Sequence, residues 1–239
     1  MNIAVIHISF NVCATALLLP LNGLLVKLAT LTVPDDKKEE KPVLLDERLL
    51  ATPAVAIQRA QDIATRMAED SAQAMRLAME LTRKFDSKTM NRVLELENNT
   101  DRYEDALGTY LVRLSSRSLS VSDSRILNTL LYTISDVERI ADHAVNVGKA
   151  ALEMDEKKIV FSQQAQGELE VLERAVSDIL GRTVEAYRSF DRELARKVEP
   201  QEQVVDALVR EIKSRHIRRL REGTCSVEYG FVLEDLLTA

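Results

Sequence analysis

The chain has 239 residues, of which 46% are hydrophobic and 29% charged, with only 7 glycines and 5 prolines. So few turn-forming residues favour long helices joined by short connections. The formal net charge of −6 argues against nucleic-acid binding, which requires a basic surface. The 2 cysteines, Cys13 and Cys225, are far apart and form no CxxC motif, which argues against a disulfide framework or a zinc site.

The N-terminal segment 3–33 is almost wholly apolar. A secretory signal peptide would carry lysine or arginine before the apolar run, and this segment does not. Pro20 and Gly23 would damage a helix buried in a soluble core. The segment is long enough to cross a bilayer, which takes roughly 20 residues. We therefore predict that residues 1–33 form one hydrophobic, transmembrane helix.

The next segment, 34–42, is dense in charge and lies between two prolines. It has no hydrophobic periodicity, so we predict a solvated linker. Small and apolar residues then recur at spacings of three and four for about 30 residues after Pro53, which predicts a long helix. That stripe consists of Ile57, Ala60, Ala64, Met67, Ser71, Ala74, Ala78, Leu81 and Phe85.

Two further helices follow, at about 87–116 and about 122–152. The first has an apolar stripe of Val93, Leu96, Tyr103, Leu107, Tyr110 and Leu114, and the second one of Leu127, Leu130, Ile134, Val137, Ala141 and Ala144. Three long helices with short connections predict an antiparallel bundle, spanning residues 43–156.

The helical pattern then recurs over residues 157–239. Two long helices are predicted at about 162–190 and about 191–222, with a third beginning near Val227. A shift of 105 residues places an ExxxD motif of the second helix on one in the fifth helix. This repetition predicts two tandem three-helix units. The sequence ends where the same shift would place a further acidic motif, so we expect the second bundle to be truncated.

Acidic side chains flank the seam between the second and third helices. Glu97, Asp101 and Asp105 follow one another at spacings of four, and so do Glu138 and Asp142. Residues four apart stack on one side of a helix, here about 40° from the apolar stripe. Carboxylates so arranged repel one another unless a cation neutralises them. Their hard oxygen atoms suit Mg, Ca, Mn or Fe, so the pattern indicates a metal site.

Other interpretations of these acids are open. They are also compatible with a solvated helix face, in which Arg102 and Arg139 pair with them. His143 would add a nitrogen ligand, but it points about 100° away from Asp142. A ferritin-like di-iron site needs Glu-x-x-His, and position 140 is isoleucine. The sequence has neither a glycine-rich phosphate loop nor a nucleophile elbow, so we predict that the protein is not an enzyme.

The segments ENNTDRYEDAL (97–107) and DVERIADHAVNV (136–147) resemble the PhoU family of phosphate-signalling proteins. Members of that family are two tandem three-helix bundles whose (E/D)xxxD motifs hold metal clusters on the bundle surface. IAVIHISFNVCATALLLP (3–20) and LLDERLLATPAVAI (44–57) are similar to the C-terminal part of bacterial type II sodium/phosphate cotransporters. In those proteins a membrane region of inverted repeats precedes a cytoplasmic PhoU-like domain.

The resemblance implies an all-α fold of PhoU-like tandem three-helix bundles preceded by one hydrophobic helix. It implies metal-ligand roles for Glu97, Asp101, Glu138 and Asp142 in the first bundle. It implies matching metal-ligand roles for Glu202 and Asp206 in the second bundle. Asp105 is a further candidate ligand, which we infer from helix geometry alone. The ions would be divalent or ferric, and the sequence does not identify them.

The resemblance also implies the C-terminal portion of a sodium-dependent phosphate transporter, with residues 43–239 on the cytoplasmic side of the inner or plasma membrane. Its partners would be the membrane domain of the same parent chain, inorganic phosphate and sodium, and the oligomeric state stays open, a homodimer included. The family's QSS-type transport motifs are absent here, so the chain alone is not expected to carry either ion. The alternatives are a membrane-tethered PhoU-like signalling adaptor and a plain structural bundle.

Overall fold

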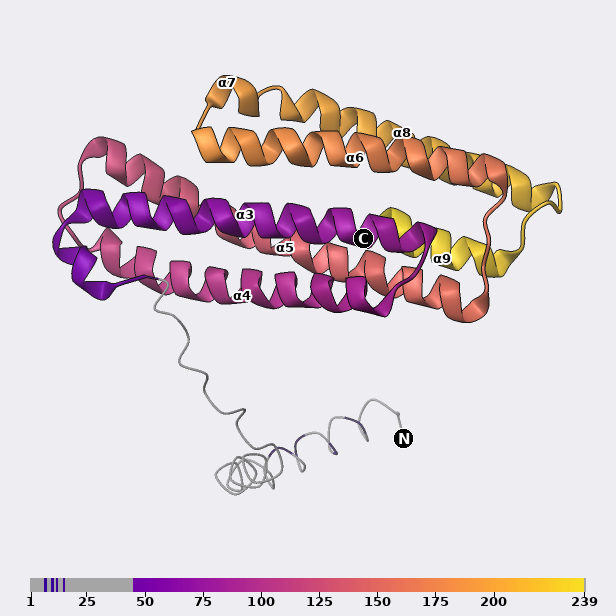
Figure 1. Cartoon of the computed structure of the whole chain (residues 1–239), viewed down its shortest axis with the longest axis horizontal. Helices are drawn as coiled ribbons and strands as arrows, with labels where there is room; N and C mark the ends of the chain where they lie inside the picture. The colour runs from indigo at the N-terminus through magenta and orange to yellow at the C-terminus, as the bar shows by residue number, and fades with distance from the viewer. Residues whose placement is uncertain (1–6, 8–9, 11, 13–14, 16–44, 239) are drawn as a thin grey trace. The chain divides into compact units, whose positions relative to one another are not determined.

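The computed structural model describes residues 45–238, together with residues 7, 10, 12 and 15. Every regular element between residues 45 and 238 is a helix (Figure 1). The elements are η2 (Glu47–Ala51), α3 (Pro53–Arg83), α4 (Ser87–Ser115), α5 (Val121–Lys157), α6 (Gln163–Ser189), α7 (Arg192–Ala195), α8 (Val198–Arg221) and α9 (Val227–Thr238). All of them belong to one compact unit, which confirms the predicted all-helical class for this part of the chain.

Apart from the four isolated positions, the predicted hydrophobic helix (1–33) and the predicted linker (34–42) lie outside the described residues. Within the described residues, we find no helix with both the length and the apolar character needed to span a membrane. The prediction of a transmembrane segment therefore stays a prediction.

Local sequence explains where the long helices begin and end. Asp86 and Ser120 are the N-caps of α4 and α5, and their side chains accept hydrogen bonds from backbone N–H groups in the first turn. Pro53 begins α3, at a position where the missing N–H would have no helical partner. Lys158 and Phe190, after α5 and α6, adopt left-handed backbone conformations that end the helices.

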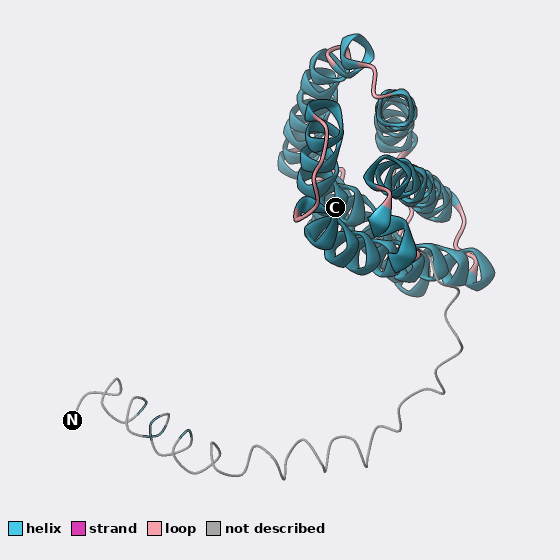
Figure 2. Ribbon diagram, turned by 90° about the vertical axis from the view of Figure 1, so that its left-hand side faces the viewer, coloured by secondary structure: helices cyan, strands magenta, loops and turns pink. Residues whose placement is uncertain are grey.

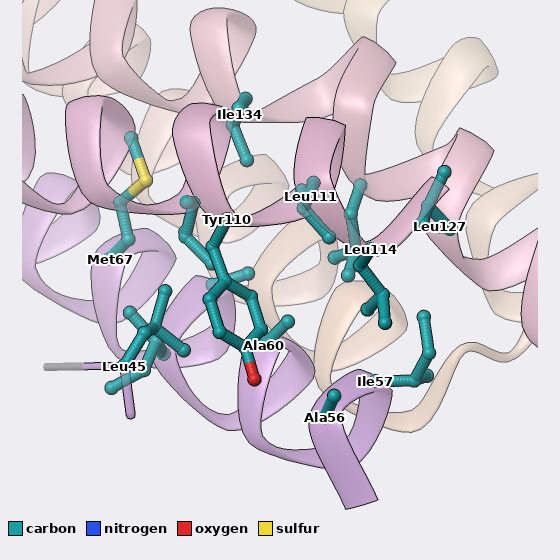
Figure 3. Packing of buried hydrophobic residues seen from close by; sticks show 14 of the residues in the cluster. Leu45, Ala56, Ile57, Ala60, Met67, Tyr110, Leu111, Leu114, Leu127 and Ile134 are labelled. Carbon is teal, nitrogen blue, oxygen red and sulfur yellow. The ribbon is translucent and has the colours of Figure 1, made fainter. Parts of the chain in front are cut away.

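Helices α3, α4 and α5 pack against one another along their lengths, with α3 also contacting α6 (Figure 1, Figure 2). The predicted apolar stripes are the buried faces of these helices, although Phe85 and Tyr103 are only half-buried. Figure 3 shows one end of this core, where Ile57 and Ala60 of α3 lie near Leu111 and Leu114 of α4. The heptad-like periodicity therefore identified the three-helix core correctly.

Helices α6, α8 and α9 surround a separate apolar cluster that includes Phe161, Leu172, Ile212 and Val232. Helix α9 packs against both α5 and α8, and Leu236 contacts the clusters of both groups of helices. One predicted helix, about 191–222, is interrupted: α7 and α8 are separate elements. The two groups of helices thus share contacts within one compact unit.

Candidate metal centre

The candidate site lies where α4 and α5 run side by side. Glu97 and Asp101, one turn apart on α4, meet Asp142 of α5. Each of the three side chains offers a carboxylate oxygen, and these oxygens all lie within 4.8 Å of one another. Oxygen ligands about 2.3–2.6 Å from a calcium ion are at most about 5 Å apart, so a single ion fits among the three carboxylates.

Burial and like charge act together at this site. Burial raises the pKa of Glu97, and the carboxylates of Asp101 and Asp142 raise it further, against an opposing effect of Lys149. The pKa of Asp101 is also raised, first by burial and then by Asp142 and its acidic neighbours on α4. Repulsion of this kind indicates that negative charge accumulates on the α4–α5 seam.

Glu138, the other predicted ligand on α5, shows the strongest perturbation. Its half-buried carboxyl group has a pKa raised to about 7, first by desolvation and then by the charges of Asp142, Glu104 and Asp101. Glu138 is not one of the three side chains whose oxygens meet within 4.8 Å. It lies one turn before Asp142 and shares its electrostatic environment, so it extends the acidic seam rather than completing the central group.

Arg102 and Arg139 do not form ion pairs with these acids. Arg139 forms an ion pair with Asp136, at 3.8 Å between Nη1 and Oδ1, on the exposed side of α5. The Nε atom of Arg102 is buried and has no hydrogen-bond partner among the described residues. In this part of the chain no lysine or arginine lies within 4.0 Å of the carboxylates of Glu97, Asp101 or Asp142. The three carboxylates are therefore not part of a helix face on which acids and arginines form salt bridges.

Other predicted ligands lie apart from the group. Asp105 is exposed and does not join the three carboxylates. Glu202 and Asp206 are exposed on α8, and Asp206 accepts a 3.4 Å hydrogen bond from Arg210. Among residues 45–238 no second carboxylate group of this kind occurs. His143 is half-buried and its Nδ1 has no partner in this region, but it is not part of the group either.

The sequence prediction missed Glu104. This half-buried side chain of α4 accepts a 2.5 Å hydrogen bond from the Ser135 hydroxyl of α5, and its charge contributes to the raised pKa values of Asp101 and Glu138. Glu104 lies three residues after Asp101, so it too is a neighbour on the helix surface. An i,i+3 search for acids beside the ExxxD ladder would have identified it.

The fold and the site together define, over residues 45–238, a helical bundle with a carboxylate cluster on its surface. The profile of the PhoU domain matches residues 64–151 and 169–236, which together make up more than half of the chain. The chain belongs to the PhoU domain family. The matched ranges contain α4, most of α5 and the whole carboxylate group.

Several curated proteins are similar to this chain in sequence. The phosphate-specific transport system accessory protein PhoU homolog of Xylella fastidiosa (strain 9a5c) is 24% identical over 175 residues, covering 72% of this chain and 73% of the relative. The phosphate-specific transport system accessory protein PhoU of Escherichia coli (strain K12) is 31% identical over 125 residues, covering 51% of this chain and 49% of the relative. The PhoU homolog 1 of Thermotoga maritima is 25% identical over 158 residues, covering 61% and 64%. No solved structure matches the chain significantly.

These comparisons confirm the PhoU-like part of the resemblance. They do not show a sodium/phosphate cotransporter, a membrane domain in the same chain, or a role for sodium. The relatives are accessory proteins by name, which is consistent with the prediction that this chain is not an enzyme.

Proposed function

We propose that this protein regulates phosphate transport and that a metal ion held by Glu97, Asp101 and Asp142 sets its regulatory state. The observation that carries the proposal is the meeting of three carboxylates from two helices within 4.8 Å, inside the segment that matches the PhoU domain. The relatives named above are accessory proteins of phosphate-specific transport systems. That name supports a regulatory role for this chain also.

The donor set fits a hard ion. Carboxylate oxygens favour Mg, Ca, Mn or ferric iron over soft metals. The bound cation would neutralise the repulsion that raises the pKa values of Glu97 and Asp101 and would displace protons from the acidic seam. Because the ligands come from both α4 and α5, the ion would tighten the contact between these helices. Loss of the ion would loosen it, and a partner in contact with this face would detect the difference.

The proposal is tested by phosphate uptake in cells that lack the protein. Restoring the wild-type chain should restore control of uptake by external phosphate, whereas the Asp101→Asn/Asp142→Asn variant should not. Asp105→Asn is the matched control, because Asp105 is an exposed acid of α4 outside the group. Full restoration of control by the Asp101→Asn/Asp142→Asn variant would contradict the proposal.

A second candidate is that this regulatory bundle belongs to a sodium-dependent phosphate transporter rather than to a separate adaptor. The almost wholly apolar segment 3–33, which precedes the charged segment 34–42 and the bundle in the sequence, favours a membrane attachment of the chain. The gene and its upstream sequence distinguish the two candidates. Upstream membrane repeats with QSS-type motifs, together with sodium-dependent uptake by the whole protein, would support the transporter, and their absence would support a tethered adaptor.

A further inference from the structure

A pocket of about 460 Å³ lies where α6 and α9 begin and α8 ends. Figure 1 shows the start of α6 and the α8–α9 turn at the same end of the helices. Phe161 and Tyr229, whose rings meet edge to face, contribute apolar lining. The polar lining includes His216 and Cys225, neither of which belongs to the carboxylate cluster. The pocket therefore contains a thiol and an imidazole that have no role in the proposed regulatory mechanism.

The imidazole of His216 is held beside this thiol. His216 is only 8% exposed, and its Nδ1 lies 3.7 Å from the Sγ of Cys225. Its Nε2 is buried and has no partner among the described residues. On the other side of the ring, a Cβ atom added to Gly230 would lie 2.8 Å from Nε2. Glycine at this point lets the α9 backbone approach the ring, which fixes the imidazole toward Cys225.

The surroundings favour a neutral imidazole. Burial lowers the pKa of His216, the positive charge of Arg219 lowers it further, and Glu168 opposes these effects. Glu168 is bound to Arg219 by two hydrogen bonds of 2.9 Å. When Nε2 carries the proton of the neutral imidazole, Nδ1 can accept the proton of the Cys225 thiol, and the carbonyl of Ser226, 3.6 Å from Sγ, is a second acceptor.

We propose that Cys225 is a reactive thiol and that hydroperoxides oxidise it to a sulfenic acid in this pocket. His216 Nδ1 accepts the thiol proton, and the thiolate sulfur attacks one oxygen of the peroxide. The S–O bond forms as the O–O bond breaks, and the departing oxygen takes the proton from His216 to give water or an alcohol. Sulfur loses two electrons and the peroxide gains them. The half-buried position of Cys225 at an open pocket gives the peroxide access.

The test uses the full chain with Cys13→Ser, which leaves Cys225 as the sole thiol. After treatment with hydrogen peroxide and dimedone, mass spectrometry should show one adduct, located on Cys225. Alkylation by iodoacetamide between about pH 5 and 9 then measures the thiolate directly. At about pH 7 the folded protein should react about tenfold faster than the His216→Asn variant, because the variant lacks the imidazole that accepts the thiol proton.

Two glycine variants separate chemistry from folding. Gly230→Ala keeps both reacting groups but pushes a methyl group against the His216 ring and disturbs its position beside Cys225, so alkylation should slow toward the rate of His216→Asn. Gly181→Ala, on α6 with nothing within 4 Å of the added Cβ, should leave the rate and profile unchanged. Equal rates and profiles for wild type and His216→Asn would overturn the proposal. So would a dimedone adduct that forms only after the chain is unfolded in urea.

Discussion

At the scale of single residues, Glu138 shows that the acidic seam works against folding when no cation is present. Its pKa is raised to about 7, first by burial and then by the charges of Asp142, Glu104 and Asp101. The folded protein therefore holds the proton of Glu138 more tightly than the unfolded chain does. Groups perturbed in this way are common at functional sites, where charge is arranged for binding rather than for stability.

The sign of the pH effect follows from linkage. A carboxyl group whose pKa rises from 4.5 to about 7 on folding contributes stability below about pH 4.5, and this is lost as pH rises through about 7. We predict that, with a chelator present, Glu138→Gln unfolds at higher denaturant concentration than wild type at about pH 8 but not at about pH 4. Because solvent screens this half-buried group, the difference should be about 1 kcal/mol. Equal denaturation midpoints at about pH 8 would contradict the pKa shift.

Side-chain positions were harder to predict from the sequence than helices were. The three acids that meet, Glu97, Asp101 and Asp142, were predictable because the ExxxD spacing places them beside the apolar stripes. Asp105 was predicted as a ligand, whereas in the structure it is Glu104 that contacts α5. Positions three and four residues away both neighbour Asp101, and the rotation of α4 against α5 decides between them. That rotation depends on how the two helices pack, which periodicity does not determine.

At the scale of helices, α6 and α8 are joined by a buried ion pair. The guanidinium group of Arg219 donates two 2.9 Å hydrogen bonds to the carboxylate of Glu168, and both side chains are more than nine-tenths buried. Arg215 adds a longer contact of 3.6 Å to Glu168. Desolvation of both charges offsets much of their attraction, but removing one partner leaves the other charged and buried.

We predict that Glu168→Ala lowers the free energy of unfolding by about 3–5 kcal/mol, because Arg219 then lacks its buried counter-ion. The double variant Glu168→Met/Arg219→Met should unfold within about 1 kcal/mol of wild type or above it, since an apolar pair of similar volume avoids the desolvation cost. Urea denaturation followed by circular dichroism measures both. A double variant as unstable as Glu168→Ala would show that the ion pair itself, rather than burial of a lone charge, holds these helices.

Helix boundaries were predicted well except where two elements adjoin. The predicted helix 191–222 divides into α7 and α8. Asp191 caps α7 by accepting hydrogen bonds from the N–H groups of Glu193 and Leu194. Pro200 lies in the first turn of α8, where its missing N–H is tolerated, whereas in the middle of a continuous helix it would remove a hydrogen bond. The aspartate and the proline together are sequence signals for the start of a new helix, and hydrophobic periodicity does not take such signals into account.

At the scale of the whole described unit, burial is unevenly distributed. Helix α3 has buried residues along almost its whole length and packs against α4, α5 and α6. In α8 the buried residues are Ile212, His216 and Arg219, all in its C-terminal half. Segments with few buried contacts open locally at low free-energy cost. The beginning of α8 is therefore the less stable part of this unit.

We predict that this difference appears in amide hydrogen exchange. Amides of the α8 segment 201–210 should exchange faster than those of the α3 segment 63–78, because α8 is exposed there and α3 is enclosed by other helices. Mass spectrometry of peptic fragments from the full chain measures both segments in one experiment. Equal protection of the two segments would indicate that a partner surface or a second copy covers α8 in solution.

The all-helical class and the helices of both groups could be predicted from the sequence because apolar periodicity reports burial directly. The contacts between the two groups of helices could not be predicted. They arise because α9 packs against both α5 and α8 through residues such as Leu236, and the repeat pattern does not mark such residues as different from other apolar positions. The pairing of His216 with Cys225 was also missed, since it depends on the close approach of α9 at Gly230.

Metal stoichiometry of the full chain is the most direct test of the carboxylate site. The protein would be stripped with a chelator, dialysed against Mn²⁺, Mg²⁺ or ferric iron, and analysed by elemental mass spectrometry. The wild type and the Asp105→Asn control should retain the preferred ion, and the triple variant Glu97→Gln/Asp101→Asn/Asp142→Asn should lose it. Equal metal content in the triple variant and the wild type would show that these three acids are a solvated helix face and not a metal centre.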